Sequence, residues 1–237
     1  MMKLMSSLLS IFPLSWVCGF LYGQTPAISV PFSDDFLFKE KSVSSVWKEV
    51  PVHALKKLDD DGREAVTQFQ LTYSEKGIYV HFYGDEWKIT TSAKADFEDL
   101  FKGDVYEVFF QPDASKPIYL EYEINANNHE LVLLIPNYGG KFLGWTPWKY
   151  EGERKIIKNT WLEKNPDQSA PFTWHAEIFF PYQLFNPMIQ GKPEKGTTWR
   201  GNFYRLDYDM GKMVKWAWSP IVKSFHEYAK YGVLVFE

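Results

Sequence analysis

The sequence has 237 residues and a formal net charge of −4, with 18% aromatic residues that include ten Trp and fourteen Tyr. Lysine and arginine form no cluster, and binding to nucleic-acid phosphates requires clustered positive charge, so the composition excludes nucleic acid as a partner. The aromatic excess favours a surface for a ligand with flat apolar faces, as sugars have.

The N-terminal residues have the pattern of an export signal. Lys3 supplies a positive charge, and residues 8–23 form a short, interrupted apolar segment. A bilayer span needs about 20 consecutive apolar residues, so we expect residues 1–23 to be a signal peptide and not a transmembrane helix. Residues 24–237 then form one exported domain that is periplasmic, at the cell surface or secreted.

Cys18 is the only cysteine in the chain. Cleavage after Gly23 removes it, and the exported domain then has no disulfide framework. In the alternative interpretation Cys18 becomes a lipidated N-terminus. Trp16 and Val17 argue against this alternative, because a lipidation signal has small residues at such positions.

The exported part has no internal repeat and no long stretch of helical periodicity. Short runs rich in Val, Ile, Phe and Tyr recur between turn residues, which is typical of β-strands. This pattern predicts an all-β fold, a two-sheet antiparallel β-sandwich of immunoglobulin-like or jelly-roll-like type with long loops. The predicted strands are residues 65–73, 77–85, 104–112, 118–126, 129–136, 172–181, 198–208, 214–220 and 230–237.

Three further segments complete the sandwich. Residues 181–187 are expected to form one short helix at a sheet end. Residues 86–103 and 137–171 are long and irregular, and long loops on a rigid sandwich commonly carry binding residues.

Acidic residues gather beside a glycine in "LDDDGRE", residues 58–64. Calcium loops have a similar composition, but this segment lacks the ligand spacing and the closing glutamate of an EF-hand. We expect a solvated turn, with bound Ca2+ as the alternative.

Glu107 interrupts an otherwise apolar strand, "GDVYEVFFQP" at residues 103–112. By the alternation of a strand, Val105 and Phe109 share its face, while Tyr106 lies on the other face. A carboxylate in such a strand is costly unless it is paired, hydrogen-bonded or open to a cleft. Glu107 is therefore a candidate site residue.

The next predicted strand, residues 118–126, adds two carboxylates to the same sheet face. A hairpin with symmetric register places Glu107 opposite Glu121 and Val105 opposite Glu123. Like charges that face each other destabilise a sheet, so a positive or hydrogen-bonding group is expected among them. The alternative for these two glutamates is a solvated outer face with incidental salt bridges.

Arg200 and Arg205 are the candidate positive groups. Their odd spacing within the strand 198–208 points them to opposite faces, so only one can reach the carboxylates. We favour Arg205, whose face continues through Phe203 and Asp207.

Trp145 and Trp148 lie in "GWTPW", within the loop 137–171 that also contains Trp161. They either extend an aromatic platform for a ligand or pin the loop onto the sandwich, and we favour pinning.

The five histidines show no metal-ligand spacing. His81 and His175 lie within predicted strands and are expected to be structural. His226 lies in a loop near the C-terminus and stays a candidate site residue.

Six segments occur in an order that carries a resemblance: "GIYVHFYGDE", "FKGDVYEVFFQP", "IYLEYEIN", "TWHAEIFFP", "TWRGNFYRLD" and "WSPIVKSFHEYAKYGVLVF". Together they resemble the family 9-like carbohydrate-binding modules, exported bacterial β-sandwich domains related to the family 9 modules of xylanases. The resemblance covers most of residues 24–237. It implies non-catalytic binding of a mono- or oligosaccharide, often at a chain end, in support of polysaccharide capture and carbohydrate catabolism.

The resemblance also implies which residues hold the sugar. The family clamps it between two aromatic residues, which correspond here to Phe101, three positions before the Asp of the Asp-x-x-Glu strand, and Phe225, in the last loop. The Glu of that strand, here Glu107, hydrogen-bonds sugar hydroxyls. Founding members have tryptophan at both clamp positions, so the phenylalanines are a departure, with Trp87 and Trp218 as nearby substitutes.

The resemblance extends to cofactors and partners. Some related xylanase modules bind Ca2+, although Ser44 and Ser45 stand where the family usually carries an Asp ahead of the early Trp. The implied partners are the saccharide and glycan-degrading enzymes, and we expect a monomer.

Two other functions stay open. A glycoside hydrolase would use opposed carboxylates such as Glu107 and Glu121 about 5 Å apart, as retaining enzymes do. A haem-binding sandwich would use Met and His axial ligands, for which Met210, Met213 and His226 are available.

Overall fold

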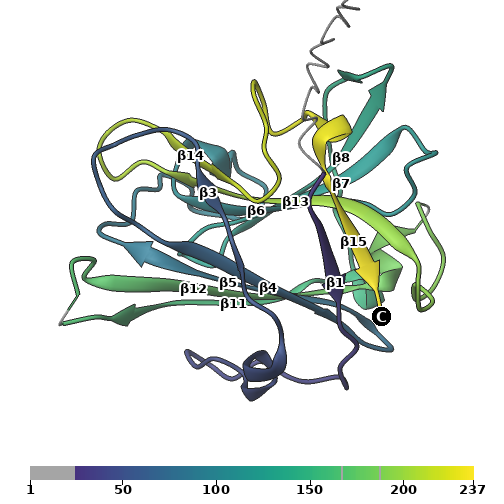
Figure 1. Cartoon of the computed structure of the whole chain (residues 1–237), viewed down its shortest axis with the longest axis horizontal. Helices are drawn as coiled ribbons and strands as arrows, with labels where there is room; N and C mark the ends of the chain where they lie inside the picture. Colours follow the sequence, from purple (N-terminus) through teal and green to yellow (C-terminus); the bar gives the residue numbers. More distant parts are fainter. Residues whose placement is uncertain (1–24, 167, 187) are drawn as a thin grey trace, which may run out of the picture.

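Two β-sheets pack face to face in the computed structural model, which describes residues 25–166, 168–186 and 188–237 (Figure 1). The expected signal peptide, with Cys18, lies outside the described residues. Within the described part of the chain, no helix is long and apolar enough to cross a bilayer. The sandwich prediction is confirmed. Its only helical segments in the described residues are short 3-10 turns: η1 Ser45–Glu49, η2 Leu100–Lys102, η3 Gly152–Arg154, η4 Tyr182–Phe185 and η5 Tyr228–Lys230.

The larger sheet has the strand order β1-β15-β13-β6-β7-β8-β10, with β14, β3 and β9 attached beside this path. Among the described residues its strands pair antiparallel, except that β1 pairs parallel with β15. Its strands are β1 Ala27–Val30, β3 Lys56–Lys57, β6 Val105–Gln111, β7 Ile118–Ile124, β8 Glu130–Tyr138, β9 Lys141–Phe142, β10 Thr146–Pro147, β13 Thr198–Asp207, β14 Val214–Ala217 and β15 Gly232–Phe236.

The smaller sheet is antiparallel and has the order β11-β12-β5-β4-β2. It forms the lower layer in Figure 1. Its strands are β2 His53–Ala54, β4 Thr67–Tyr73, β5 Gly77–Glu86, β11 Ile157–Lys164 and β12 Phe172–Pro181.

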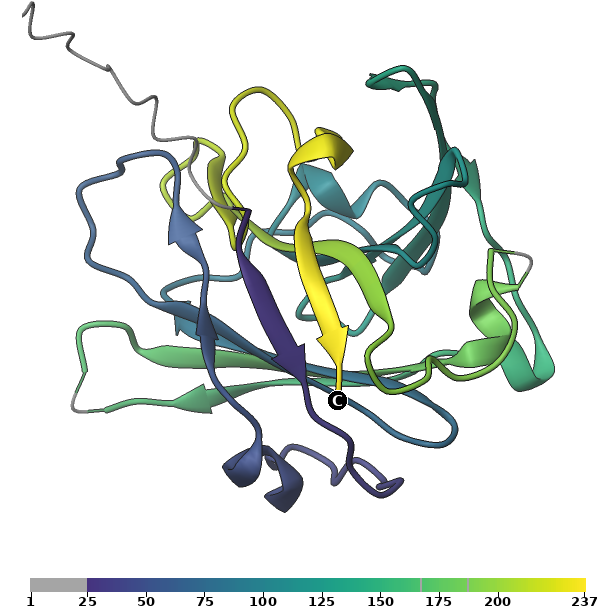
Figure 2. The same ribbon diagram turned by 45° about the vertical axis from the view of Figure 1, so that its right-hand side comes forward.

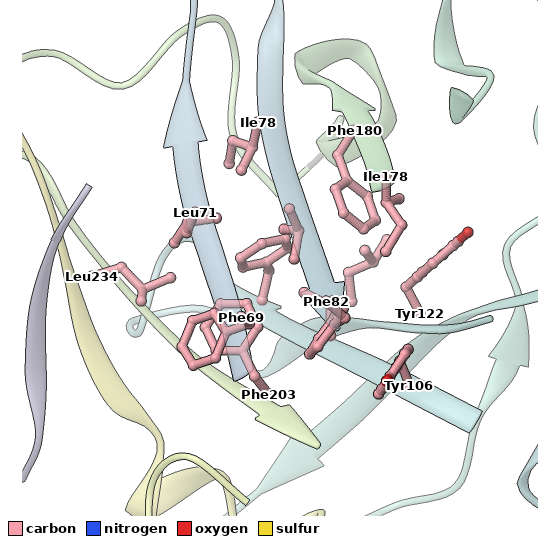
Figure 3. Packing of buried hydrophobic residues seen from close by; sticks show 14 of the residues in the cluster. Phe69, Leu71, Ile78, Phe82, Tyr106, Tyr122, Ile178, Phe180, Phe203 and Leu234 are labelled. Atoms are coloured by element: carbon pink, nitrogen blue, oxygen red, sulfur yellow. The ribbon is translucent and has the colours of Figure 1, made fainter. Parts of the chain in front are cut away.

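Aromatic rings from both sheets interlock in the core between them (Figure 3). Phe69 of β4 stacks on Phe203 of β13 with ring centroids 4.0 Å apart, and Phe82 of β5 stacks on Tyr106 of β6 at 4.7 Å. These large side chains are fully buried. Each contributes apolar area whose removal from water stabilises the fold by roughly 25 cal/mol per Å2.

A second apolar cluster covers the opposite, outer face of the larger sheet. It takes the alternate residues of the same strands, among them Phe109, Tyr119, Leu133 and Tyr204. The segment 218–231 rises over this face on the side away from the smaller sheet (Figure 2). Because both faces of β6 and β7 are covered, most positions of these strands are apolar, and Glu107 lies beneath loops instead of facing bulk water.

The main strands lie close to their predicted positions, and β12 has the predicted bounds. The expectation that residues 137–171 form an irregular loop is wrong, because this segment contains β9, β10 and the eight residues of β11. β11 pairs with β12 at the edge of the smaller sheet and is largely exposed. An exposed edge strand can be polar on both faces, so it lacks the apolar alternation by which strands are predicted.

Candidate functional site

A cavity of about 390 Å3 lies on the outer face of the larger sheet. Outward side chains of β6, β7 and β8 form its floor, and the loops that precede β6, β10 and β15 form its walls. We call it the glutamate cavity. The residues that matter most below are Glu107, Glu121 and Glu123 on the floor, and Phe101, Trp145 and Phe225 on the walls.

β6 and β7 pair in a register that differs from the symmetric hairpin. Glu107 lies opposite Glu123. The predicted pairs Glu107–Glu121 and Val105–Glu123 are therefore both wrong, and the observed register of β7 against β6 is shifted by two residues. In the turn that connects the two strands, the Lys116 N–H donates to the Asp113 carbonyl (3.1 Å). A shift of two preserves the alternation of faces, so the three glutamates still share one face.

The three floor glutamates are almost completely buried, with 2%, 5% and 1% of Glu107, Glu121 and Glu123 exposed. Burial raises the pKa of Glu121 to about 8. Burial and repulsion between the glutamates raise the pKa of Glu107 and of Glu123 well above the usual range. The Oε2 atoms of Glu121 and Glu123 have no hydrogen-bond partner in the described chain. The floor can therefore accept hydrogen bonds from a ligand.

Phe101 is fixed on the cavity wall by two backbone contacts. The Tyr208 hydroxyl donates to the Phe101 carbonyl (2.8 Å), and the Phe101 N–H hydrogen-bonds Glu123. The side chain is 36% exposed and lines the cavity. The wall is thus tied to the floor and to the end of β13.

Phe225 lies on the wall formed by the segment before β15. Its ring stacks on Tyr204 with centroids 4.0 Å apart and an angle of 11° between the planes. Its carbonyl accepts hydrogen bonds from the hydroxyls of Tyr204 (3.0 Å) and Tyr231 (3.1 Å). These contacts hold an aromatic surface at the cavity, on a loop that is otherwise partly exposed.

His226 also lines the cavity. Its Nδ1 lies 2.8 Å from the Tyr119 hydroxyl and 3.7 Å from Oε2 of Glu121, and its ring stacks on Phe142 at 4.2 Å. Burial lowers the pKa of His226 to about 4. The imidazole is neutral at pH 7 and does not offset the glutamate charge.

The tryptophans of the loop 137–171 have different positions. Trp145 is 57% exposed and lines the glutamate cavity, whereas the prediction favoured pinning for this residue. Trp148 does pin the loop, because its Nε1 donates to the Leu184 carbonyl (3.0 Å) and its ring packs on the core. Trp161 stacks on His175 at 4.7 Å in the smaller sheet.

Arg205 does not face the glutamates, so this prediction is wrong. Arg205 pairs with Tyr106 across β13 and β6, and its face is the core face, whereas Tyr204 lies opposite Glu107 on the outer face. The buried guanidinium instead joins the two sheets, with hydrogen bonds to Glu86 (3.2 Å) and Asp207 (3.0 Å).

Arg200 does not reach the glutamates either, since it donates to the carbonyls of Ala229 (2.9 Å) and Tyr231 (2.8 Å).

Trp87 and Trp218 do not line the glutamate cavity, which corrects their expected role as substitute clamps. Trp87 lies at the end of β5 beneath the guanidinium of Arg63, 4.7 Å from its ring centroid. Trp218 belongs to the core between the sheets, where its ring meets Phe203 at 5.8 Å. Trp218 therefore lies on the core face of the larger sheet, and Trp87 directly follows β5 of the smaller sheet.

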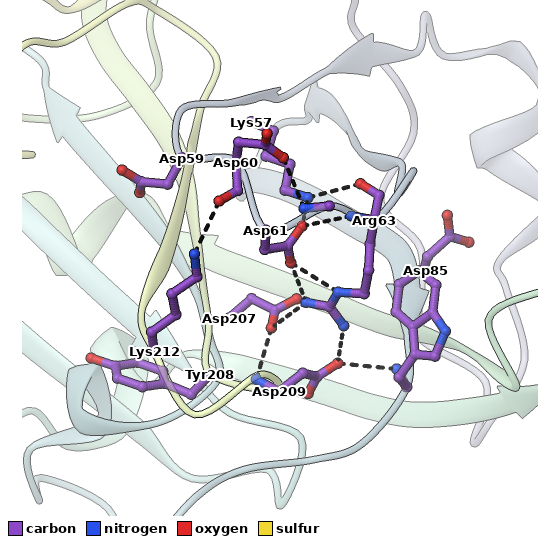
Figure 4. A network of polar contacts seen from close by, with 12 residues as sticks. Lys57, Asp59, Asp60, Asp61, Arg63, Asp85, Asp207, Tyr208, Asp209 and Lys212 are labelled. Carbon is purple, nitrogen blue, oxygen red and sulfur yellow. Dashed lines mark hydrogen bonds and ion pairs between the residues drawn. The ribbon is translucent and has the colours of Figure 1, made fainter.

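The acidic segment 58–64 interacts with cations of the chain itself (Figure 4). Asp61 binds both Lys57 and Arg63, and Arg63 continues to Asp207 (3.3 Å) and Asp209 (2.9 Å). These ion pairs hold the pKa of Asp61 below its usual range. A calcium loop presents free oxygen ligands in a ring, so the segment 58–64 does not fit Ca2+.

A different carboxylate group, Glu86, Asp104 and Asp209, brings one oxygen from each residue within 4.8 Å of the others. Burial and mutual repulsion raise the pKa of Glu86 to about 9 and that of Asp104 to about 7. Oδ1 of Asp209 is buried without a hydrogen-bond partner in the described chain. Glu86 and Asp209 each also contact an arginine, Arg205 at 3.2 Å and Arg63 at 2.9 Å. The carboxylate oxygens that these contacts leave over are hard donors of the kind that Ca2+ prefers, so the group fits the ion.

The remaining candidates are the histidines of the strands and the two methionines near the C-terminus. His81 Nδ1 lies 3.1 Å from Gln70 and its Nε2 lies 3.2 Å from His175, in a buried network that accounts for both histidines structurally. Met213 lines the glutamate cavity together with His226, but Met210 is exposed and does not.

Several lining residues were not predicted from the sequence. Leu131 and Leu133 of β8 extend the apolar part of the cavity, and Phe97 and Asp99 come from the long segment before β6. The period-two pattern of β8 contained a signal for the leucines, since they share one face of a strand next to β7. No pattern in an irregular segment marks Phe97 or Asp99.

Comparison with known proteins gives one family and several similar folds. Residues 48–236 match the sequence profile of carbohydrate-binding family 9. A candidate carbohydrate-binding protein from Bacteroides uniformis has a TM-score of 0.72 at 18% identity, over 90% of this chain and 99% of that chain. No curated protein sequence matches the chain.

Two further similar structures come from one protein, a family 9 carbohydrate-binding module from Caldicellulosiruptor kristjanssonii. Its complex with glucose has a TM-score of 0.62 at 14% identity, over 89% of this chain and 95% of that chain. Its complex with cellotriose has a TM-score of 0.59 at 14% identity, over 89% and 93%. At these identities the structures establish a shared fold.

Proposed function

Because the chain belongs to carbohydrate-binding family 9, whose profile covers residues 48–236, we propose that the glutamate cavity binds a saccharide and leaves it chemically unchanged. The resemblance seen in the sequence is thereby confirmed at the level of the family. The complexes of the Caldicellulosiruptor module with glucose and cellotriose support a sugar as the ligand class.

One observation carries this proposal: aromatic side chains and buried carboxylates line the same cavity. Phe101, Trp145 and Phe225 offer apolar surface, and sugar C–H faces pack on such surface. The floor glutamates accept hydrogen bonds, and adjacent sugar hydroxyls donate them. Binding of a hydroxyl-rich ring in this cavity satisfies carboxylate oxygens that no described residue satisfies.

Titration calorimetry with glucose, xylose, galactose and their oligosaccharides tests the proposal. We expect micromolar to millimolar binding that Phe225→Ala weakens at least about tenfold, since the variant removes one wall. Phe32→Ala is the matched control, because Phe32 is exposed and lies outside the cavity. The proposal fails if the folded protein binds no sugar, or if both variants bind like the wild type.

We infer that no hydrolysis accompanies binding. A retaining glycosidase needs one ionised carboxylate as nucleophile beside a protonated acid, so the two pKa values must be pushed apart. Here burial raises the pKa of all three glutamates together. Incubation with oligosaccharides and chromatography of the products checks this, and release of shorter sugars that Glu107→Gln abolishes would establish a hydrolase.

Calcium is also proposed, at Glu86, Asp104 and Asp209. Their carboxylates would hold the ion, and Ca2+ would supply positive charge that joins the ends of β5 and β13 to the segment before β6. We expect added Ca2+ to raise the melting temperature of chelator-treated protein, and Asp209→Asn to reduce this shift. An equal shift in both proteins would argue against the site.

Export, a monomeric state and glycan-degrading partner enzymes stay predictions. The export prediction rests on the pattern of residues 1–23, and mass spectrometry of protein from the producing cell would distinguish cleavage after Gly23 from lipidation at Cys18.

A further inference from the structure

Once ionised, the three glutamates of the glutamate cavity have no cationic partner in the part of the chain that the structure describes. Within the described residues no lysine or arginine forms an ion pair with Glu107, Glu121 or Glu123, and His226 is the one residue with a titratable nitrogen near them. Lys215 and Lys223 reach the rim, but Lys215 lies 3.7 Å from Asp59 and Lys223 is exposed to solvent. Each lysine charge is therefore either directed elsewhere or screened by water.

The other charged or titratable groups of the cavity do not supply the missing charge. His226 is the closest candidate, with Nδ1 3.7 Å from Oε2 of Glu121, but it is neutral at pH 7 as described above. Asp99 lies at the rim and adds negative charge. A bound ligand is thus the remaining source of positive charge at the floor.

An ammonium group suits this floor better than a hydroxyl group. It has three N–H donors on one atom, and hydrogen bonds between charged groups are roughly twice as strong as those between neutral groups. A hydroxyl group donates one hydrogen bond and leaves the repulsion between the carboxylates unchanged. The aromatic walls add to the preference, because a cation within about 6 Å of a ring is attracted by its face.

We propose that the glutamate cavity prefers a saccharide unit that carries a protonated amino group, such as a 2-amino-2-deoxyhexose, over the neutral hexose. The preference arises from the three buried carboxyl groups, two of which have an oxygen with no partner in the described residues. This inference rests on the proposed function, because it specifies the class of sugar for the same cavity.

Calorimetry with glucose, glucosamine and N-acetylglucosamine at pH 7 tests the inference. Glucosamine is expected to bind at least about tenfold tighter than glucose, and N-acetylglucosamine, which lacks the charge, is expected to lose this gain. Repeating the titrations in buffers of different ionisation enthalpy measures the number of protons that the complex releases or takes up on binding. We expect proton release with glucosamine and none with glucose, since an ammonium favours the ionised form of the carboxyl groups.

Variants identify the residues responsible. Glu121→Gln and Glu123→Gln keep the shape of the floor and are expected to reduce the preference for glucosamine over glucose. Glu194→Gln is the matched control, since Glu194 is exposed and outside the cavity. Circular dichroism and melting temperature show that each variant is folded.

The outcomes separate the two proposals. Equal affinity for glucose and glucosamine, or tighter binding of N-acetylglucosamine, overturns the preference for an amino sugar and leaves saccharide binding intact. A glucosamine preference that survives both floor variants also overturns it. If the folded protein binds none of these sugars or the neutral panel, saccharide binding itself is wrong.

Discussion

Glu107, Glu121 and Glu123 place three carboxyl groups in a buried environment that opposes their ionisation, and neighbouring glutamates oppose it further at Glu107 and Glu123. An apolar residue at any of these positions would serve the fold better, since unpaired buried charge destabilises a protein. The glutamates therefore reduce stability at neutral pH and gain interactions only when a ligand is bound. Such a conflict between packing and polarity is typical of a binding site.

Glu123→Gln should change how the stability of the protein depends on pH. The raised pKa of Glu123 means that the native state holds its proton more tightly than the unfolded state, whose pKa is near 4.5. Its contribution to stability is complete below about pH 4.5 and is lost as pH rises through the native pKa. We expect the variant to match the wild type at pH 4 and to exceed its free energy of unfolding by about 1 kcal/mol or more at pH 8.

Urea denaturation at both pH values measures this effect. Glu194→Gln serves again as the control and should leave the pH profile unchanged. A Glu123→Gln protein less stable than the wild type at pH 8 would show that the carboxylate is compensated inside the fold.

The "GWTPW" segment shows how one short element can serve two purposes. Its β10 strand pairs with β8 at the edge of the larger sheet. On one side of it Trp145 reaches the glutamate cavity, and on the other side Trp148 anchors the segment to the core through Leu184. The anchor places the exposed ring at the cavity wall.

This arrangement predicts opposite effects for two neighbouring tryptophans. Trp148→Ala should lower the free energy of unfolding by about 1–3 kcal/mol, because it removes packing and a hydrogen bond. Trp145→Ala should leave stability within about 0.5 kcal/mol, as exposed substitutions do, and weaken sugar binding. Denaturation and calorimetry on both variants check the pair. If Trp145→Ala lowers stability and leaves sugar binding unchanged, Trp145 is an anchor of the segment and not part of the binding site.

At the ends of the strands, Arg205 connects elements of both sheets. It extends from β13 and bonds Asp85 and Glu86 of β5 as well as Thr67 of β4, while its own side chain is completely buried. Removing one partner of a buried ion pair leaves the other charge without compensation, which typically costs about 3–5 kcal/mol.

We therefore expect Arg205→Met to lower the free energy of unfolding by about 3–5 kcal/mol in urea denaturation. Arg154→Met, at an exposed arginine, is the control and should change it by less than about 0.5 kcal/mol. A small effect of Arg205→Met would show that the neighbouring carboxylates take up protons without loss of structure.

At the scale of the whole molecule, the two faces of the larger sheet have different roles, one in the core and one at the binding site. The inner face shares one continuous core with the smaller sheet, and the outer face carries the glutamate cavity. The stacked rings of Phe69 and Phe203 come from different sheets, so neither sheet keeps its core when the other unfolds.

This shared core predicts cooperative unfolding. Tryptophan fluorescence and far-ultraviolet circular dichroism should give coincident urea transitions, as expected for a single unit without a populated intermediate. A bound sugar should raise stability by RT ln(1 + [L]/Kd), about 2.7 kcal/mol at a hundredfold excess over Kd. Separated transitions would show that the outer-face loops or one sheet unfold independently.

The sequence by itself determined the fold class, the main strands and the presence of carboxylates on one face of two strands. Alternation with period two and the turn residues carry this information locally, because side chains of a strand point to opposite faces in turn. The same local rule identified Glu107 as an anomaly and, with the family resemblance, led to Phe101 and Phe225.

Only the tertiary structure decided which residues meet. Register depends on the geometry of a turn, so Glu107 pairs with Glu123 and not with Glu121. The choice of face in β13 depends on what covers each side of the sheet, and the outer face, covered by loops, carries an apolar cluster of its own. Arg205 and Trp218 therefore belong to the interior, while Trp145 reaches the cavity, because packing between distant segments selects among faces that alternation leaves equivalent.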